Sequence, residues 1–142
     1  MIVYLESSAV LAWLLGEIEG DAVRAILEQA ERVVTSSLTR VECCRALARA
    51  RILGRISATE ELAALDLLEL AETRWDVHDL SDRVLLRASA PFPSEPVRTL
   101  GAIHLATAAL VLEGLGRVSV LTLDERIRVN TVGMGLGVVP EL

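Results

Sequence analysis

The chain has 142 residues, of which 52% are hydrophobic and only 3% aromatic, and its formal net charge is −6. This length predicts a single domain over residues 1–142, with a core built mainly from aliphatic side chains. The negative net charge argues against broad, nonspecific binding to nucleic acid, which needs basic residues to neutralise phosphates. A local basic patch is still compatible with it, and all 14 basic residues are arginines.

The first half of the chain is predicted to alternate short apolar strands with helices. Ser7 or Ser8 is expected to cap the first helix, and Ser57 with Glu60 gives a capping-box pattern at the last one. The expected elements of this half, in chain order, cover residues 2–5, 9–15, 21–30, 32–35, 38–53 and 57–73.

The second half repeats this alternation, with a stiff loop enforced by Pro91, Pro93 and Pro96. Its expected elements cover residues 75–78, 81–88, 97–112, 118–122, 124–131 and 136–139. Strands that alternate with helices predict an α/β fold. We therefore expect three layers, with a central, mostly parallel sheet of about four to five strands covered by helices on both faces.

No segment of the sequence has the pattern of a membrane span or a signal peptide. The N-terminus lacks a positive start, and Glu6 interrupts its apolar run. The longest uncharged helical stretch, about 100–112, is too short to cross a bilayer. Cys43 and Cys44 are adjacent on a predicted helix, so their side chains diverge and reduced thiols are expected. A cytoplasmic protein is the resulting expectation.

Three carboxylates from distant segments are predicted to meet. Glu6 ends the first strand, Asp124 follows the strand 118–122, and Glu42 lies on the helix after the second strand. In a parallel α/β sheet, ligands bind beyond the carboxyl ends of the strands, where the strand order reverses. Carboxylate oxygens are the ligands that Mg²⁺ and Mn²⁺ favour, and such ions activate water for phosphodiester hydrolysis.

Each of these residues also has an ordinary structural interpretation. Glu42 alone would be a solvated helix residue, and Asp124 is a plausible helix cap. Glu6 is harder to explain in this way, because a charge at the end of a buried strand needs a partner. His104 lies one turn after Gly101 and could approach the site, but we favour its interpretation as a hydrogen-bonded core histidine. Ser7, Ser8 and Thr122 lie beside the acids and are candidates for orienting them.

Four segments in this order resemble the PIN-domain family, and most closely its toxins of the VapC type. The most specific is LGAIHLATA at residues 100–108. The other three are residues 2–9, which end the first strand at Glu6, the stretch 40–42, and residues 121–126 around Asp124. The resemblance covers nearly the whole chain and implies a PIN-like fold.

The resemblance further implies a metal-dependent endoribonuclease with about four acids around Mg²⁺ or Mn²⁺. Carried over position by position, the catalytic and metal-binding acids fall on Glu6, Glu42 and Asp124, and the third acid position falls on Gly101. The implied partners are an RNA substrate and a VapB-like antitoxin. A homodimer is also implied, for which the leucine-rich helical segments 11–15 and 62–70 offer apolar surface.

The sequence departs from the family pattern at two of these positions. The first acid is usually Asp, and Glu6 is one methylene longer. Gly101 removes a charged ligand and also costs about 1 kcal/mol of helix stability relative to Ala. Two functions therefore stay open, a ribonuclease with a weakened site and a binding module that docks an antitoxin or RNA without cleaving it. Gly101 is either natural or the replacement of a toxic catalytic acid. A phosphoacceptor domain is disfavoured because the chain has no lysine.

Arginines gather on and just after the helix that carries Glu42. Arg45 and Arg49 share one face of it, and Arg98 and Arg126 lie nearer the acids along the sequence. Two interpretations stay open, an RNA-backbone patch and a solvated, ion-paired helix face. The cluster consists of Arg40, Arg45, Arg49, Arg51 and Arg55.

Overall fold

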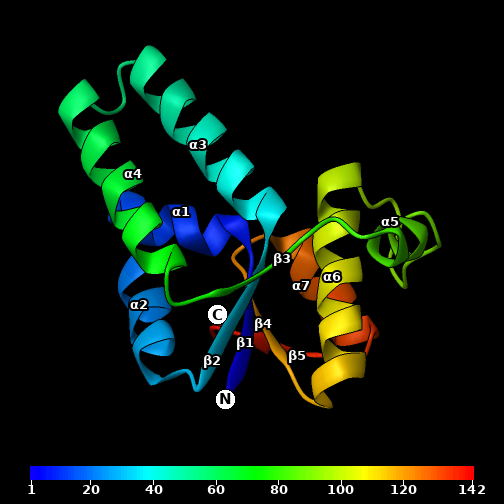
Figure 1. The fold of residues 1–142 in the computed structure, drawn as a ribbon. Helices are drawn as coiled ribbons and strands as arrows, with labels where there is room; N and C mark the ends of the chain where they lie inside the picture. The colour runs from blue at the N-terminus through cyan, green and yellow to red at the C-terminus, as the bar shows by residue number, and fades with distance from the viewer.

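The computed structural model describes residues 1–142 and contains a five-stranded, entirely parallel sheet (Figure 1). The strand order is β3-β2-β1-β4-β5. The strands are β1 (Ile2–Leu5), β2 (Arg32–Ser36), β3 (Asp76–His78), β4 (Ser119–Leu121) and β5 (Gly137–Val139). The predicted α/β class and parallel sheet are confirmed.

Seven helices cover the two faces of this sheet and give the predicted three layers. The helices α1 to α4 lie on one side of the sheet and α5 to α7 on the other (Figure 1). Their bounds are α1 (Ser7–Leu15), α2 (Gly20–Gln29), α3 (Ser37–Ile52), α4 (Ala58–Glu72), α5 (Asp82–Ala88), α6 (Thr99–Leu115) and α7 (Glu125–Gly133). No helix is long and apolar enough to span a membrane.

The central strand β1 shows why the sheet forms at this place in the sequence. Val3, Tyr4 and Leu5 are each fully buried, because helices cover both faces of the strand. Tyr4 packs into a cluster with α6 and α7, whereas Val3 and Leu5 pack into a second cluster with α1, α2 and α3. Successive side chains of β1 thus serve the two cores of the molecule in turn.

Most helix ends follow the expected capping chemistry, but the first one does not. The capping box of Ser57 and Glu60 is present, and Gly16 ends α1 with a φ of 64°. The expectation that Ser7 or Ser8 caps the first helix is wrong. The helix begins at Ser7, and Glu6 is its N-cap, accepting a hydrogen bond from the backbone N–H of Ser8. The carboxylate takes this role because Glu6 is the single residue between the end of β1 and the start of α1.

The helix α6 is shifted relative to its predicted range of 97–112. Arg98 has an extended backbone, so the helix begins at Thr99. It continues through Gly114 and ends at Gly116, whose φ of 74° suits a glycine. The shift keeps Gly101 and His104 in the first two turns, at the end of the helix that lies near β1.

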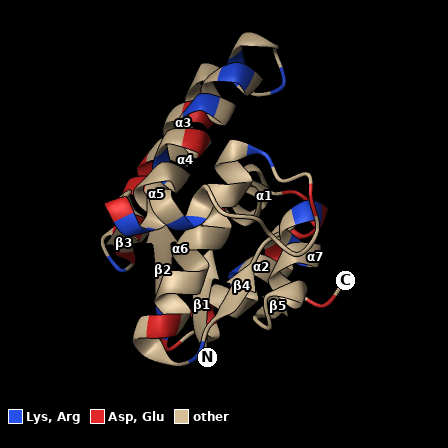
Figure 2. Ribbon diagram, turned by 90° about the vertical axis from the view of Figure 1, so that its right-hand side faces the viewer, with Lys and Arg blue, Asp and Glu red and all other residues tan.

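The helices α3 and α4 form a hairpin that projects beyond the sheet (Figure 1). Basic positions recur along α3 toward its far end (Figure 2). Two arginines of the five-residue cluster form ion pairs across the hairpin, Arg40 with Glu72 and Arg51 with Glu61. The interpretation as an ion-paired face therefore holds for these two, while Arg45, Arg49 and Arg55 form no ion pair.

Candidate active site

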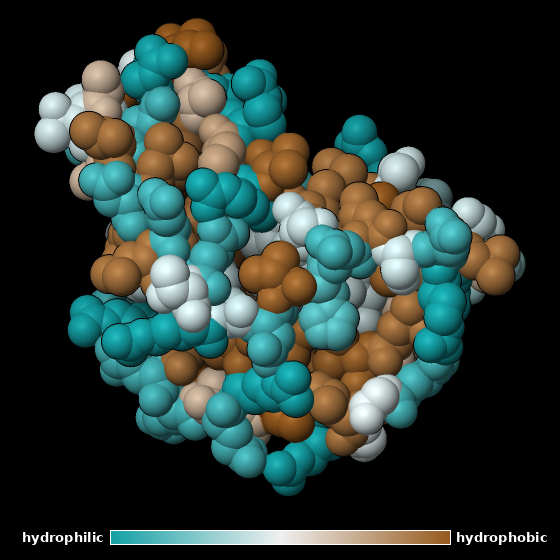
Figure 3. Space-filling model, viewed as in Figure 1, coloured by the Kyte–Doolittle hydropathy of each residue, from teal (hydrophilic) through white to brown (hydrophobic).

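A cavity of about 600 Å³ opens beyond the carboxyl ends of the central strands. The chain crosses from β1 to β2 on one side of β1 and places β4 on the other side, so the strand order reverses at β1. The surface is notched between the α3–α4 hairpin and the side formed by α5 and α6 (Figure 3). The cavity is lined by Glu6, Glu42, Val97, Arg98, Thr99, Leu100, Gly101, His104, Asp124, Arg126 and Ile127.

Glu6 lies at the floor of this cavity and is only 4% exposed. Its Oε1 accepts a hydrogen bond from Ser7 Oγ at 2.7 Å. Its Oε2 accepts from the hydroxyls of Ser8 and Thr122, the latter at 2.7 Å, and from the Ser8 backbone N–H at 3.1 Å. These donors hold the carboxylate in place, as expected for Ser7, Ser8 and Thr122, but no lysine or arginine neutralises its charge.

Glu42 enters the cavity from α3 and faces the same serine. Ser7 Oγ lies 3.2 Å from Glu42 Oε1, so one hydroxyl connects the two carboxylates. The Glu42 side chain is 21% exposed, and its Oε2 has no hydrogen-bond partner within the protein. Two carboxylates this close repel one another unless a cation binds between them. Glu42 Oε2 is free to bind such a cation.

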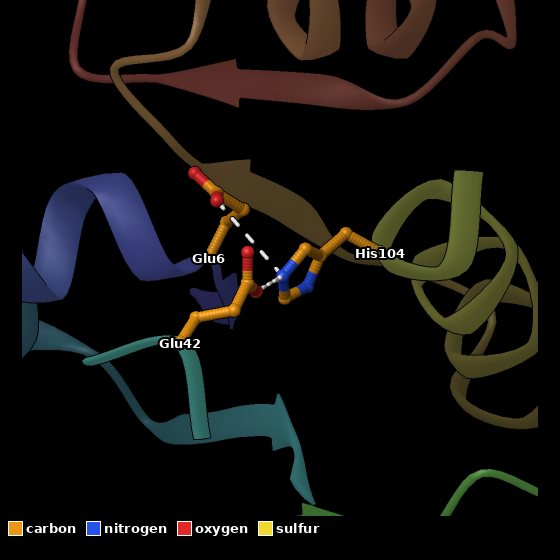
Figure 4. A group of neighbouring side chains, drawn as sticks. All are labelled: Glu6, Glu42 and His104. Atoms are coloured by element: carbon orange, nitrogen blue, oxygen red, sulfur yellow. Dashed lines mark hydrogen bonds and ion pairs between the residues drawn. The ribbon is translucent and has the colours of Figure 1, made fainter. Parts of the chain in front are cut away.

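His104 is the residue of the site that the sequence interpretation underestimated. Its ring is 1% exposed and its Nδ1 lies 2.8 Å from the Tyr4 hydroxyl, which confirms a hydrogen-bonded core histidine. Its Nε2, however, contacts Glu42 Oε1 and lies 3.9 Å from Glu6 Oε1 (Figure 4). The spacing of three residues from Gly101 was the available signal, because it places both on one face of α6.

Asp124 lines the same cavity but stands outside the tight group of Glu6, Glu42 and His104. Its Oδ1 caps α7 by accepting from the Ile127 backbone N–H at 3.0 Å. Its backbone N–H donates to Thr122 Oγ1 at 3.1 Å, which links it to the hydroxyl that also holds Glu6. The predicted cap is present, and Oδ2 has no hydrogen-bond partner in the protein.

Gly101 forms part of the cavity wall in the first turn of α6. A Cβ atom at this position would meet Val97 Cγ1 at 3.7 Å and Ile127 Cγ1 at 3.8 Å, which are ordinary van der Waals contacts. The backbone therefore does not require glycine here, and a Cβ atom would fit. Its presence leaves this wall without a carboxylate.

The residues present suit a divalent cation. Ligand atoms of Glu6, Glu42 and His104 lie within 4.8 Å of one another. Oxygen donors dominate the group, as hard divalent ions require. Arg98 and Arg126 line the same cavity, so positive side chains stand beside the acids. An acidic group next to arginines is an arrangement that can bind a cation and an anionic substrate together.

The chain is similar in sequence to proteins of one known family. The model of a family described as "PIN domain" matches residues 3–131. Ribonuclease VapC46 of Mycobacterium tuberculosis is 37% identical over 137 residues, which cover 96% of this chain and 95% of that protein. Ribonuclease VapC35 of the same species is 31% identical over 140 residues, 97% of this chain and 96% of that protein.

Solved structures with the same fold include two from bacterial pathogens. The M. tuberculosis VapC20, described as a sarcin-ricin loop cleaving toxin, has a TM-score of 0.65 at 15% identity and matches 91% of this chain and 94% of that one. A toxin–antitoxin complex from Klebsiella pneumoniae has a TM-score of 0.63 at 17% identity, covering 97% of this chain and 96% of that one. At such identities these structures support the fold alone.

Proposed function

The chain belongs to the PIN-domain family, and from this premise we propose that it is a metal-dependent endoribonuclease, the toxin of a toxin–antitoxin pair. One observation carries the proposal: Glu6, Glu42 and Asp124, which are far apart in sequence, line a single cavity at the point where strand order reverses. Two relatives that match over almost their full lengths are ribonucleases by name.

We assign the metal-binding and catalytic roles to Glu6, Glu42 and Asp124, with Mg²⁺ or Mn²⁺ as the ion. When bound, such an ion lowers the pKa of a water molecule and neutralises charge on the phosphate. Ser7, Ser8 and Thr122 hold the Glu6 carboxylate in one orientation through the hydrogen bonds given above. The free oxygens of Glu42 and Asp124 face no competing donor in the protein.

Binding of the RNA backbone is assigned to the arginines at the cavity. Arg98 is exposed and forms no hydrogen bond or ion pair through its side chain, so it is free to contact a phosphate. Arg126 donates to the Pro96 carbonyl oxygen at 3.3 Å and lines the same cavity. Arginine suits this role because its planar fork makes two-point contacts with phosphate oxygens.

The partners follow from the same assignment. We propose a VapB-like antitoxin as the binding partner in the cytoplasm, since one structural neighbour is a toxin–antitoxin complex. We also propose a homodimer. Leu62, Leu67 and Leu70 on α4 are between 40% and 66% exposed, and burial of such side chains would favour association.

A cleavage assay on structured RNAs, including a sarcin–ricin-loop hairpin, tests the activity. The wild-type protein should cleave with Mn²⁺ or Mg²⁺, and Glu42→Gln should reduce the rate on the order of a hundredfold or more. Gly101→Asp should raise the rate with Mg²⁺, because the position accepts a Cβ atom and lines the cavity that contains the acids. Gly101→Ala is the matched control, since it adds a Cβ without a charge.

The outcomes separate the two functions that the sequence leaves open. Cleavage by the wild-type protein that needs Glu42 supports the ribonuclease. Cleavage only by Gly101→Asp would instead support a binding module whose catalysis is lost. No cleavage by either protein, on RNAs that both bind, would overturn the nuclease assignment.

A further inference from the structure

We propose that His104 supplies a further protein ligand of the metal ion beside the assigned acids, in place of the acid missing at position 101, so that the site prefers Mn²⁺ to Mg²⁺. This inference rests on the metal site of the proposed function and deepens it by assigning a ligand and an ion. It concerns a residue that the family pattern of acids does not include.

The position of His104 on α6 is the first argument. Gly101 and His104 are three residues apart, so they lie on the same face of the helix, and both line the cavity. The glycine leaves its part of the wall without any ligand atom. The imidazole one turn later offers one, and it points at the two carboxylates (Figure 4).

The distances between ligand atoms fit one shared ion. Oxygen and nitrogen ligands lie about 2.0–2.2 Å from such ions, so two ligands of one ion are at most about 4.0–4.4 Å apart. His104 Nε2 lies 3.9 Å from Glu6 Oε1 and in direct contact with Glu42 Oε1. The ligand atoms of all three residues lie within 4.8 Å of one another, so small side-chain adjustments would bring them within reach of a common ion.

The surroundings of the ring match those of a metal-bound histidine. Such a residue generally uses its second ring nitrogen in a hydrogen bond that fixes the ring orientation. His104 Nδ1 has this partner in the Tyr4 hydroxyl at 2.8 Å, and both side chains are buried. The Tyr4 hydroxyl oxygen can accept a hydrogen bond from Nδ1–H, which leaves Nε2 on the side of the two carboxylates.

The choice of ion follows from the ligand types. Mg²⁺ favours oxygen ligands and tolerates distorted geometry poorly, whereas imidazole is a good ligand for transition-metal ions. Exchanging a carboxylate for a neutral imidazole also lowers the negative charge that holds a hard cation. The site should therefore lose more affinity for Mg²⁺ than for Mn²⁺ relative to a site with a carboxylate at position 101.

The direct test is electron spin-echo modulation spectroscopy of the wild-type protein loaded with Mn²⁺. We expect nitrogen coupling from one imidazole, and its loss in His104→Gln, which keeps an oxygen ligand at the same place. His78→Gln is the matched control, because His78 is exposed on β3 and is the only other histidine. The control should retain the coupling.

Calorimetry on the same proteins measures the preference. The wild-type protein should bind Mn²⁺ at least tenfold more tightly than Mg²⁺. This ratio should fall in both His104→Gln and Gly101→Asp. Tyr4→Phe should keep the nitrogen coupling while weakening Mn²⁺ binding about 10- to 100-fold, because the ring loses the partner that orients it.

The absence of nitrogen coupling in the wild-type protein would overturn the inference, and this result does not depend on whether any variant folds. His104 would then only hold Glu42 through a hydrogen bond. Failure of the nuclease proposal is distinguishable: Mn²⁺ binding with nitrogen coupling but no RNA cleavage leaves the ligand assignment intact. Cleavage without nitrogen coupling would instead leave the nuclease intact.

Discussion

Cys43 and Cys44 are neighbours on α3 with different environments. Cys43 is fully buried on the side of the helix that faces the core, whereas Cys44 is half-buried, and both are free thiols. Burial, reinforced by the charges of Glu42 and Glu6, raises the pKa of the Cys43 thiol from 9.0 to about 12. The native state therefore holds Cys43 as an unreactive thiol at neutral pH, because the thiolate is the nucleophile.

We predict that iodoacetamide at pH 8 modifies Cys44 and spares Cys43 in the native protein, and modifies both in urea. Peptide mass spectrometry measures the two sites separately. The sign of the pKa shift also sets the effect of pH on stability: the contribution of the neutral thiol is complete below pH 9 and is lost as the pH rises toward 12. Equal modification of both cysteines in native buffer would contradict the prediction.

The sequence predicted the positions of the three acids better than their local hydrogen-bonding roles. Glu6, Glu42 and Asp124 line one cavity, as their places at two strand ends and on the helix after β2 led us to expect, and their metal-binding role stays a prediction. The capping role of Glu6 was missed because Ser7 and Ser8 have the higher cap propensity, and only the direct passage from β1 to α1 decides between them. The contact of His104 with Glu42 depends on the packing of α6 against α3, which spacing along one helix does not reveal.

At the scale of the elements, Gly101 makes α6 less stable than an alanine at the same position would. Glycine within a helix costs about 1 kcal/mol relative to Ala. A Cβ atom would find only ordinary contacts, at 3.7 Å and 3.8 Å, with Val97 and Ile127. The backbone of Gly101 is also helical with a negative φ, so no strain would follow from the substitution.

We therefore predict that Gly101→Ala raises the free energy of unfolding by up to about 1 kcal/mol in urea denaturation. Gly116→Ala is the contrasting variant, because the φ of Gly116 is 74° and an alanine there should destabilise the protein. A Gly101→Ala variant as destabilised as Gly116→Ala would contradict the prediction. Position 101 would then require glycine for a reason that the contacts around it do not explain.

The order of the elements could be predicted from the sequence, and their ends only in part. Alternation of apolar strands with helices gave every strand and helix in the right order. The capping box at Ser57 fixed the start of α4, because both of its hydrogen bonds are local. The start of α6 was placed two residues early, since the extended backbone of Arg98 leaves no mark in the hydrophobic pattern.

At the scale of the whole molecule, the net charge is negative, but positively charged side chains lie at particular places on the surface. The net charge of −6 opposes RNA binding in general, yet two arginines line the cavity that contains the acids. Several other arginines are neutralised in ion pairs, among them Arg83 with Glu113. Arg98 forms no such pair, so RNA binding should depend on its local position and not on total charge.

We predict that Arg98→Gln weakens RNA binding several-fold and reduces the slope of log K against log salt concentration by about 0.7, as expected for one lost phosphate contact to a single strand. Arg83→Gln is the matched control, because it changes the net charge equally but removes a residue on α5 that is paired with Glu113. Fluorescence anisotropy in a Glu42→Gln background measures binding without cleavage. Equal effects of the two substitutions would mean that the total charge, rather than the arginine at the cavity, governs the encounter with RNA.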